Sequence, residues 1–333
     1  MSTFEHGSVF HIPWPMVVGE EHDRAWSLFG TGRQALRSVV QEQGWSRVWL
    51  PTYYCHDVTD ALRAVCDVEL YEAAPFDDEV VLTIADDEAA LAVEYFGLRS
   101  GVTVHGGQWV LDVTHDPTAD YCYGRSAEFI LASLRKTLPI PDGAAVWSRG
   151  DLPCLSEPEV APEHARAVLD LLTGMSMKGA YLAGSEVSKP SFRALLERGE
   201  ERLAVSLHSG ISDWSRTVVR HADLDAVVGP RRENIRAFFE AWPEPPGVEL
   251  VGNAAYIVLL AKSHEQRDRI RGNLIAKRVY PAVLWPLPEG GMPARHVDFS
   301  RRMLTIHADF RYDGADMRRV AELTVESVQE ANS

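Results

Sequence analysis

Residues 109–112 read Trp109-Val110-Leu111-Asp112, a short apolar run that ends in a carboxylate. Similar runs occur on either side of it, at Arg47-Val48-Trp49-Leu50-Pro51 and at Ala144-Ala145-Val146-Trp147. Apolar runs of about four to eight residues are typical of strands that are buried on both faces of a parallel sheet. The stretches between them include helical patterns, as at residues 57–64. The sequence therefore predicts an α/β fold.

Two domains are expected from the change of pattern along the chain. Residues 1–240 alternate apolar runs with helical patterns, which predicts parallel strands covered by helices on both faces, a three-layer αβα domain. The segment Trp242-Pro243-Glu244-Pro245-Pro246-Gly247 is the strongest linker signal, because proline and glycine do not continue a helix. Residues 247–333 then combine strand and helix patterns, which predicts a smaller α+β domain.

The composition excludes several classes of protein. The 333 residues carry a net charge of −15, and no basic face is evident that would bind nucleic acid. No stretch approaches the ~18 apolar residues of a membrane span, and the N-terminus lacks a signal peptide, so we expect a soluble, cytoplasmic protein. The four cysteines form no CxxC pair, so we expect reduced thiols and no metal site.

A lysine and an aspartate stand at positions that suit pyridoxal 5′-phosphate (PLP). Lys136 follows Ser133-Leu134-Arg135, and Asp112 ends the strand-like run 24 residues earlier (136 − 112 = 24). PLP needs an amine that captures its aldehyde as a Schiff base and a buried acid that keeps its ring nitrogen protonated. A neighbouring cation such as Arg135 helps a lysine to lose its proton. A solvated surface lysine is the alternative interpretation.

Three further segments contain candidate ligands of a cofactor. Gly30-Thr31-Gly32-Arg33 precedes a helical pattern and offers backbone N–H groups for a phosphate, although it matches neither a dinucleotide fingerprint nor a P-loop. Tyr53 and Tyr54 follow a strand-like run, where one ring could stack on a flat cofactor or both could close the core. His115 follows Asp112 closely and suits either a cofactor's phenolic oxygen or an ordinary turn.

Taken together, these motifs resemble those of the DegT/DnrJ/EryC1/StrS aminotransferase family, which are fold-type-I PLP enzymes. The resemblance rests on Gly30 to Leu36, Leu50 to Cys55, Asp112 to His115 and Ser133 to Pro139, in that order. The C-terminal segments Tyr280 to Pro286 and Ile306 to Tyr312 are similar to those of a shorter branch. The resemblance implies an aspartate aminotransferase-like large domain, a smaller C-terminal domain, PLP and a homodimer.

The resemblance also implies roles for individual residues. Lys136 would be the Schiff-base lysine and then the proton carrier, and Asp112 would hold the ring nitrogen. His115 falls near the phenolic oxygen, Gly32 and Arg33 fall in the phosphate turn, and Tyr53 or Tyr54 lies beside the ring. Ser215 corresponds to a segment that reaches the phosphate from a partner subunit.

One arginine bears on the choice of substrate. Arg311 suits the α-carboxylate of an amino acid, because arginine binds carboxylates in a bidentate manner, or it is a surface residue before a helix. The phosphate turn differs from the family's usual Ser-Gly-Thr, and the chain is short, which makes a nucleotide-sugar substrate less certain than the cofactor.

We expect an aminotransferase that moves an amino group from glutamate or glutamine to a keto sugar, a keto cyclitol or a related carbonyl compound in specialised biosynthesis. The alternatives are another PLP reaction (decarboxylation, elimination or racemisation of an amino-acid-like substrate) and a non-catalytic binding or regulatory relative.

Overall fold

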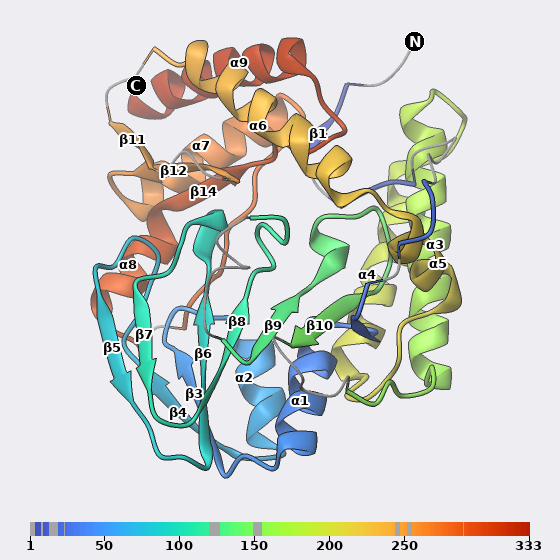
Figure 1. Cartoon of the computed structure of the whole chain (residues 1–333). Coiled ribbons are helices and arrows are strands. Elements are labelled where there is room, and N and C mark those ends of the chain that lie inside the picture. The colour runs from blue at the N-terminus through green and yellow to red at the C-terminus, as the bar shows by residue number, and fades with distance from the viewer. Residues whose placement is uncertain are drawn as a thin grey trace. The chain divides into compact units, whose positions relative to one another are not determined.

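The computed structural model describes residues 4–7, 9–12, 19–22, 24–119, 127–148, 155–243, 247–251, 255–288 and 290–333 (Figure 1). The chain forms two compact units. Unit 1 contains Phe10–Tyr95 and Arg99–Asp223, and unit 2 contains Phe4–Val9, Phe96–Leu98 and Leu224–Ser333.

The division differs from the expected boundary between residues 240 and 247. The C-terminal part of unit 2 already begins at Leu224, because the helix Leu224–Glu240 packs against the C-terminal helix Gly314–Asn332. Unit 2 also includes an N-terminal segment, since His6–Gly7 pairs in parallel with Val279–Tyr280. The predicted linker, residues 242–247, lies within unit 2 and not at its start, and its residues 244–246 are outside the described residues.

Unit 1 is built around one seven-stranded sheet. In sequence order the elements of the unit are β2 (Ser27–Phe29), α1 (Gly32–Gln43), β3 (Arg47–Pro51), α2 (His56–Arg63), β4 (Asp67–Tyr71), β5 (Val80–Thr83), β6 (Glu88–Val93), β7 (Val102–His105), β8 (Gln108–Asp112), β9 (Phe129–Ala132), the 3₁₀ turn η3 (Leu134–Lys136), β10 (Ala144–Ser148), α3 (Pro162–Leu182), α4 (Lys189–Val205) and α5 (Asp213–His221). A further 3₁₀ turn, η1 (Tyr95–Gly97), follows β6.

The sheet has the strand order β2-β10-β9-β8-β6-β3-β4, and only β10 runs antiparallel to its neighbours. Every residue of β6 and of β9 is buried, as expected for strands that are covered on both faces. The expected α/β class and central sheet are therefore confirmed.

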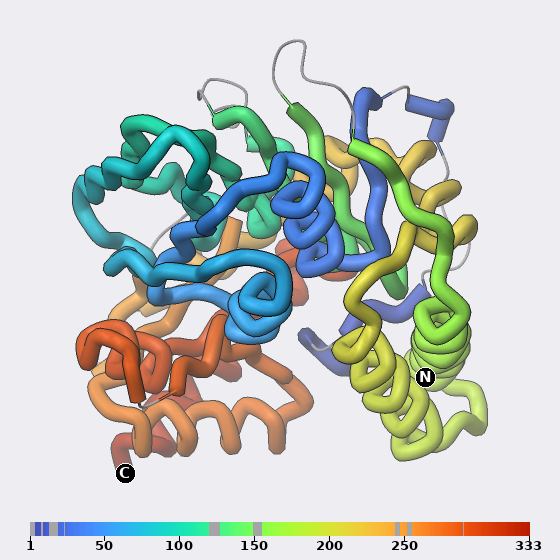
Figure 2. Tube along the Cα trace, turned by 90° about the horizontal axis from the view of Figure 1, so that it is seen from below, coloured from blue at the N-terminus to red at the C-terminus, as the bar shows by residue number. Residues whose placement is uncertain are grey.

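Helices α1 and α2 lie in contact with each other (Figure 2). The crossovers from β2 to β3 and from β3 to β4 run in the same direction along the sheet, so right-handed connections place both helices on one face. In the described residues, the returning connections from β4 to β6, β6 to β8 and β8 to β9 contain no α-helix. The first two carry β5 and β7, which pair with each other as a separate parallel ribbon.

The turn between β2 and α1 is defined by its end residues. Thr31 caps the helix, because its side chain accepts a hydrogen bond from the Gln34 N–H. Gly30 has to be glycine, since a Cβ there would lie 2.3 Å from the His164 ring. The helix ends at Gly44 in a left-handed conformation (φ 67°), which favours glycine.

Unit 2 combines a three-stranded antiparallel sheet with helices. Its core contains Phe238, Ile257, Leu304 and Val320 from four different elements. The unit consists of β1 (His6–Gly7), α6 (Leu224–Glu240), β11 (Val248–Val251), β12 (Ile257–Ala261), α7 (His264–Ala276), β13 (Val279–Tyr280), α8 (Ala294–Arg302), β14 (Met303–Ile306) and α9 (Gly314–Asn332), with the sheet order β11-β12-β14.

Candidate functional site

The candidate residues of unit 1 follow the carboxyl ends of four parallel strands. Gly32 comes after β2, Tyr54 after β3, Asp112 ends β8, and Lys136 comes after β9. Carboxyl ends of parallel strands meet at one edge of a sheet, where α/β proteins bind ligands. The fold therefore brings these four residues to the same edge, although they are spread over about a hundred residues of sequence (136 − 32 = 104).

Lys136 ends the 3₁₀ turn η3 and is exposed. In the part of the chain that the structure describes, its amine has no hydrogen-bond or ion-pair partner. The positive charge of Arg135 is the largest cause that lowers the pKa of Lys136, to about 8. Glu200 and Cys55 act in the opposite direction, so both lie near enough to interact electrostatically. The amine is thus available and more readily deprotonated than an ordinary lysine.

Arg135 is held in place by two contacts. Its Nε donates to the carbonyl oxygen of Pro141 at 3.1 Å, and its guanidinium pairs with the Glu200 carboxylate from α4. The arginine therefore does not lie free in solvent but is fixed beside Lys136. The position of Arg135 is consistent with the expected role of a cation that lowers the lysine pKa.

Asp112 is buried at the end of β8. Its Oδ2 accepts a hydrogen bond from the Tyr54 hydroxyl at 2.7 Å, and its Oδ1 accepts one from the Thr114 N–H at 2.9 Å. Burial raises the pKa of Asp112, while the contacts with Thr114 and Tyr54 oppose the rise. A carboxylate offers about four lone-pair positions, so these two donors leave room for another.

The N-terminus of α1 faces the loop that carries Lys136. A Cβ on Gly32 would lie 3.5 Å from the Ser133 Cβ, so the two segments are in close contact. The backbone N–H groups of Gly32 and Arg33 are in the first turn and have no acceptor among the described residues. The guanidinium of Arg33 turns away, because it donates to the Leu203 carbonyl at 2.6 Å and lies 3.9 Å from Asp57. Of Arg33, therefore, only the backbone N–H is available to an anion at this turn.

The two tyrosines have different surroundings. Tyr53 is fully buried and packs edge-on against Tyr95, whose hydroxyl donates to the Tyr53 carbonyl at 2.6 Å. Tyr54 is the one that reaches Asp112. His115 is buried in the loop after β8. The sequence left open whether these rings close the core or lie beside a cofactor. Tyr53 belongs to the core, and Tyr54 lies beside the Asp112 carboxylate.

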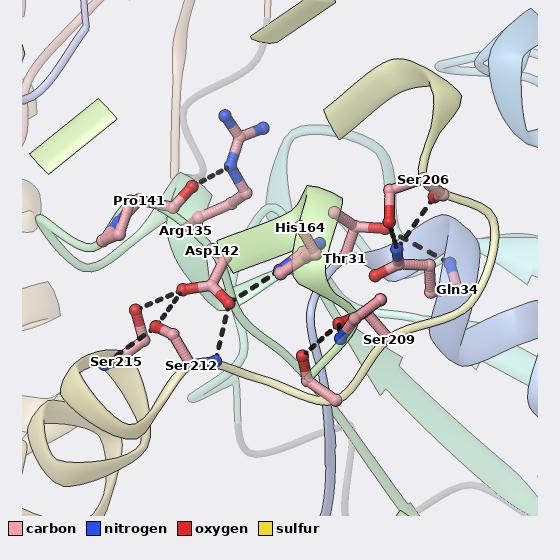
Figure 3. A network of polar contacts seen from close by, with 12 residues as sticks. Thr31, Gln34, Arg135, Pro141, Asp142, His164, Ser206, Ser209, Ser212 and Ser215 are labelled. Atoms are coloured by element: carbon pink, nitrogen blue, oxygen red, sulfur yellow. Dashed lines mark hydrogen bonds and ion pairs between the residues drawn. The ribbon is translucent and has the colours of Figure 1, made fainter. Parts of the chain in front are cut away.

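A polar cluster that the sequence did not predict lies behind the α1 turn (Figure 3). The buried Asp142 accepts hydrogen bonds from His164 Nε2 at 2.9 Å, from the Ser212 N–H at 2.8 Å and from the Ser212 hydroxyl at 2.7 Å. Next to Asp142, the Gly143 N–H donates to the Gly30 carbonyl at 2.6 Å. The cluster thereby fixes the glycine that begins the α1 turn. A charged residue two positions before the buried strand β10 was the signal available in the sequence.

The expected role of Ser215 needs correction. Its side chain is fully buried in α5, and its hydroxyl donates to Asp142 Oδ1 at 2.5 Å within the same chain. A buried hydroxyl with this partner does not extend to a phosphate of another subunit. Ser215 is part of the Asp142 cluster (Figure 3).

The expected role of Arg311 also needs correction. In unit 2 its Nε and one terminal nitrogen donate to the two oxygens of Asp309, at 2.7 and 2.8 Å. Only 6% of its side chain is exposed. Burial alone would raise the pKa of Asp309, but Arg311 holds it well below its usual value. The arginine already has a bidentate carboxylate partner, so it is not available for that of a substrate.

Two other features of the described residues bear on function. No group of three or more His, Cys, Asp or Glu side chains lies in an arrangement that could hold a metal ion. None of the described helices combines the length and the apolar character that crossing a bilayer requires. Cys55 and Cys66 are free thiols, and Cys122 and Cys154 lie outside the described residues.

Comparison with known proteins identifies the fold. No protein-family model matches the sequence, and no curated protein matches it. Among solved structures, the chain is similar to Spr1654 from Streptococcus pneumoniae in its PLP form, a candidate sugar aminotransferase (TM-score 0.62, 10% identity, covering 92% of this chain and 87% of that one). It is similar to DesI in the presence of its TDP-sugar product (0.58, 16%, 92% and 81%) and to a DegT DnrJ EryC1 StrS aminotransferase from Brucella abortus (0.50, 15%, 90% and 84%). The chain has the fold of these aminotransferases, as the motifs predicted.

Proposed function

We propose that the protein is a PLP-dependent aminotransferase of the DegT/DnrJ/EryC1/StrS type. It would transfer an amino group from glutamate or glutamine to a keto sugar, a keto cyclitol or a related carbonyl compound. One observation carries the proposal: the unpartnered Lys136 amine lies at the same sheet edge as a buried Asp112 that can accept one more donor. The aminotransferase fold of the whole chain supports it.

The residues at this edge fit PLP group by group. Lys136 supplies an amine with a lowered pKa for the aldehyde, and Asp112 supplies an acceptor for the ring N–H. The free N–H groups of Gly32 and Arg33 and the positive end of α1 suit the phosphate. Tyr54 and His115 lie in the loops next to these groups and are our candidates for contacts with the ring and its phenolic oxygen.

When bound, PLP supplies an electron sink for the pair of electrons released when a bond to the substrate's Cα breaks. The chain's own groups would do the rest. Lys136 holds the aldehyde and, once released from it, accepts the Cα proton on Nζ and returns it. Asp112 keeps the ring nitrogen protonated, because a carboxylate stabilises a cation in a buried place.

The corrected position of Arg311 bears on the substrate. Its guanidinium is paired with Asp309 and is not free for an α-carboxylate. This favours a carbonyl acceptor without that group over an enzyme dedicated to amino acids. The sugar aminotransferases among the structural neighbours point in the same direction. We also propose a homodimer in the cytoplasm, by analogy with such enzymes.

The first test is an absorption spectrum of the purified protein incubated with PLP, before and after borohydride. We expect a visible band that borohydride abolishes, absent in Lys136→Ala and retained in the control Lys262→Ala, which removes an exposed lysine of unit 2. A wild-type protein that develops no band would refute the proposal and favour a non-catalytic relative.

The reaction type needs a second test. Addition of glutamate or glutamine should convert the cofactor to its amine form, with loss of the visible band and release of the keto acid. A keto sugar should then restore the band. Release of carbon dioxide, elimination products or racemised donor, without keto acid, would instead establish one of the other PLP reactions.

A further inference from the structure

Thr114 connects the two loops that carry the proposed cofactor residues. It lies two residues after Asp112, and its N–H donates to Asp112 Oδ1 at 2.9 Å. On the other side, the Thr114 Oγ accepts a hydrogen bond from the Ser133 N–H at 3.0 Å. Thr114 thus contacts both segments, the first through its backbone N–H and the second through its hydroxyl oxygen.

This contact continues the pairing of two strands beyond their ends. Strands β8 and β9 are paired up to Asp112 and Leu131, and the Val113 N–H still donates to the Leu131 carbonyl at 2.8 Å. The next donor along β9 is Ser133, which finds a side-chain oxygen instead of a carbonyl. The Thr114 hydroxyl therefore holds the strands together where the backbone ladder has ended.

The same contact fixes the turn that presents the lysine. The Ser133 carbonyl accepts a hydrogen bond from the Lys136 N–H at 3.1 Å, which closes the first turn of η3. Ser133 is therefore held on its N–H by Thr114 and on its carbonyl by Lys136. A displacement of Thr114 would move the carboxylate loop and the lysine turn relative to each other.

We infer that Thr114 is a positioning residue that sets the Asp112 carboxylate and the Lys136 amine at a fixed separation, matched to the ring nitrogen and the aldehyde of one PLP molecule. The inference rests on the proposed function. Its hydroxyl, rather than its methyl group, carries the effect, because the hydroxyl oxygen is what ties the lysine turn to the residue whose backbone binds Asp112. Serine in this place should therefore work nearly as well as threonine, and valine should not.

The test compares Thr114→Val, which keeps the shape, with Thr114→Ser, which keeps the hydroxyl. The dissociation constant of PLP is measured by titration of the cofactor-free protein. Valine leaves the Ser133 N–H without its acceptor, and the cost of an unsatisfied donor predicts about a tenfold or larger weakening. For serine we expect a change within about threefold. Thr118→Val is the matched control, because among the described residues its hydroxyl contacts Asp116 in the same loop and not the lysine turn.

A second readout separates positioning from simple loss of structure. The pH titration of the visible band in the PLP-loaded protein reports the charge around the ring and should shift in Thr114→Val but not in Thr118→Val or Thr114→Ser. Thr114→Ala serves if the valine variant does not fold. A PLP affinity and a pH titration of Thr114→Val equal to those of the wild type would overturn the inference, as would an equal loss in Thr114→Ser. In both cases the wild type still binds PLP, so only the inference about Thr114 fails. A wild type that does not bind PLP would contradict the proposed function as well.

Discussion

Glu200 on α4 forms an ion pair with Arg135, the residue directly before Lys136. The arginine lowers the pKa of the lysine, and the glutamate acts in the opposite direction. Two neighbouring charges of opposite sign thus set the fraction of Lys136 that is neutral. Each can be removed separately, so the pair gives two predictions of opposite sign.

Removal of the arginine should make Lys136 a poorer nucleophile near neutral pH. In Arg135→Ala the pKa of Lys136 should rise from about 8 toward its ordinary value of 10.5. Each unit of increase lowers the neutral fraction about tenfold at a pH below the pKa. The measurement is the rate at which the cofactor-free protein captures PLP as a function of pH. An unchanged pH profile would show that Arg135 does not control the amine.

Removal of the glutamate should have the opposite effect. In Glu200→Gln the charge of Arg135 is no longer compensated, so the pKa of Lys136 should fall further and the capture profile should shift to lower pH. Glu197→Gln on the same helix is the matched control, because Glu197 pairs with the exposed Arg193. A shift in the same direction as that of Arg135→Ala would contradict this account.

Asp112→Asn should separate cofactor capture from turnover. The amine of Lys136 remains, so the visible band should form. An amide does not stabilise a protonated ring nitrogen, so the rate of amino transfer should fall by about 100-fold or more, as expected for a lost hydrogen bond between charged groups. Single-turnover reaction with glutamate, followed at the visible band, measures this. Wild-type turnover in the variant would exclude Asp112 as the partner of the ring nitrogen.

The pair of Arg311 and Asp309 should act on stability rather than on donor binding. Arg311→Met leaves a buried carboxylate without its partner, which costs about 3–5 kcal/mol. Arg193→Met, at an exposed pair, should cost less than about 1 kcal/mol. Denaturant unfolding measures both. A rise in the KM for the amino donor, with stability unchanged, would instead support a role for Arg311 at the substrate.

The same pair predicts how stability depends on pH. Arg311 lowers the pKa of Asp309 in the folded chain. The contribution of this ion pair to stability is therefore complete above the pKa of an unfolded aspartate, about 3.9. It is lost as the pH falls below that value. As the pH falls below about 4, the free energy of unfolding of the wild type should therefore decrease more than that of Asp309→Asn. The variant has no carboxylate at this position to take up a proton.

Local patterns predicted much of the fold and part of the site. The strand Arg47–Pro51 is predicted with its observed bounds, because an apolar run stopped by proline leaves few alternatives. Asp112 ends a strand that its apolar run predicted, whereas the strand Phe129–Ala132, which brings Lys136 to the same sheet edge, was not predicted. The antiparallel direction of β10 was not predicted, although the eleven residues from Ser133 to Gly143 are short for a parallel crossover.

Local sequence patterns could not predict contacts between residues that are distant in the chain. Asp142 finds its partners 22, 70 and 73 residues away, in His164, Ser212 and Ser215, so no spacing rule indicated the cluster. Arg311 is different, because its partner Asp309 is only two residues away. A carboxylate so close in the sequence was a signal that the Arg311 guanidinium is paired within the chain and not free for a substrate. The roles of Gly32, Tyr54 and His115 toward the cofactor remain predictions.

The pairing of β2 with β10 has a consequence for the order in which unit 1 assembles. Phe29 is paired with Ala144, 115 residues later (144 − 29 = 115). The Gly30 carbonyl accepts its hydrogen bond from the Gly143 N–H. During synthesis, β2 therefore has no partner in the seven-stranded sheet until β10 has been made. Pairings of such long range close slowly. We therefore expect the glycine turn of α1 to become ordered only after the lysine loop exists, and a chain that ends before β10 to lack this turn.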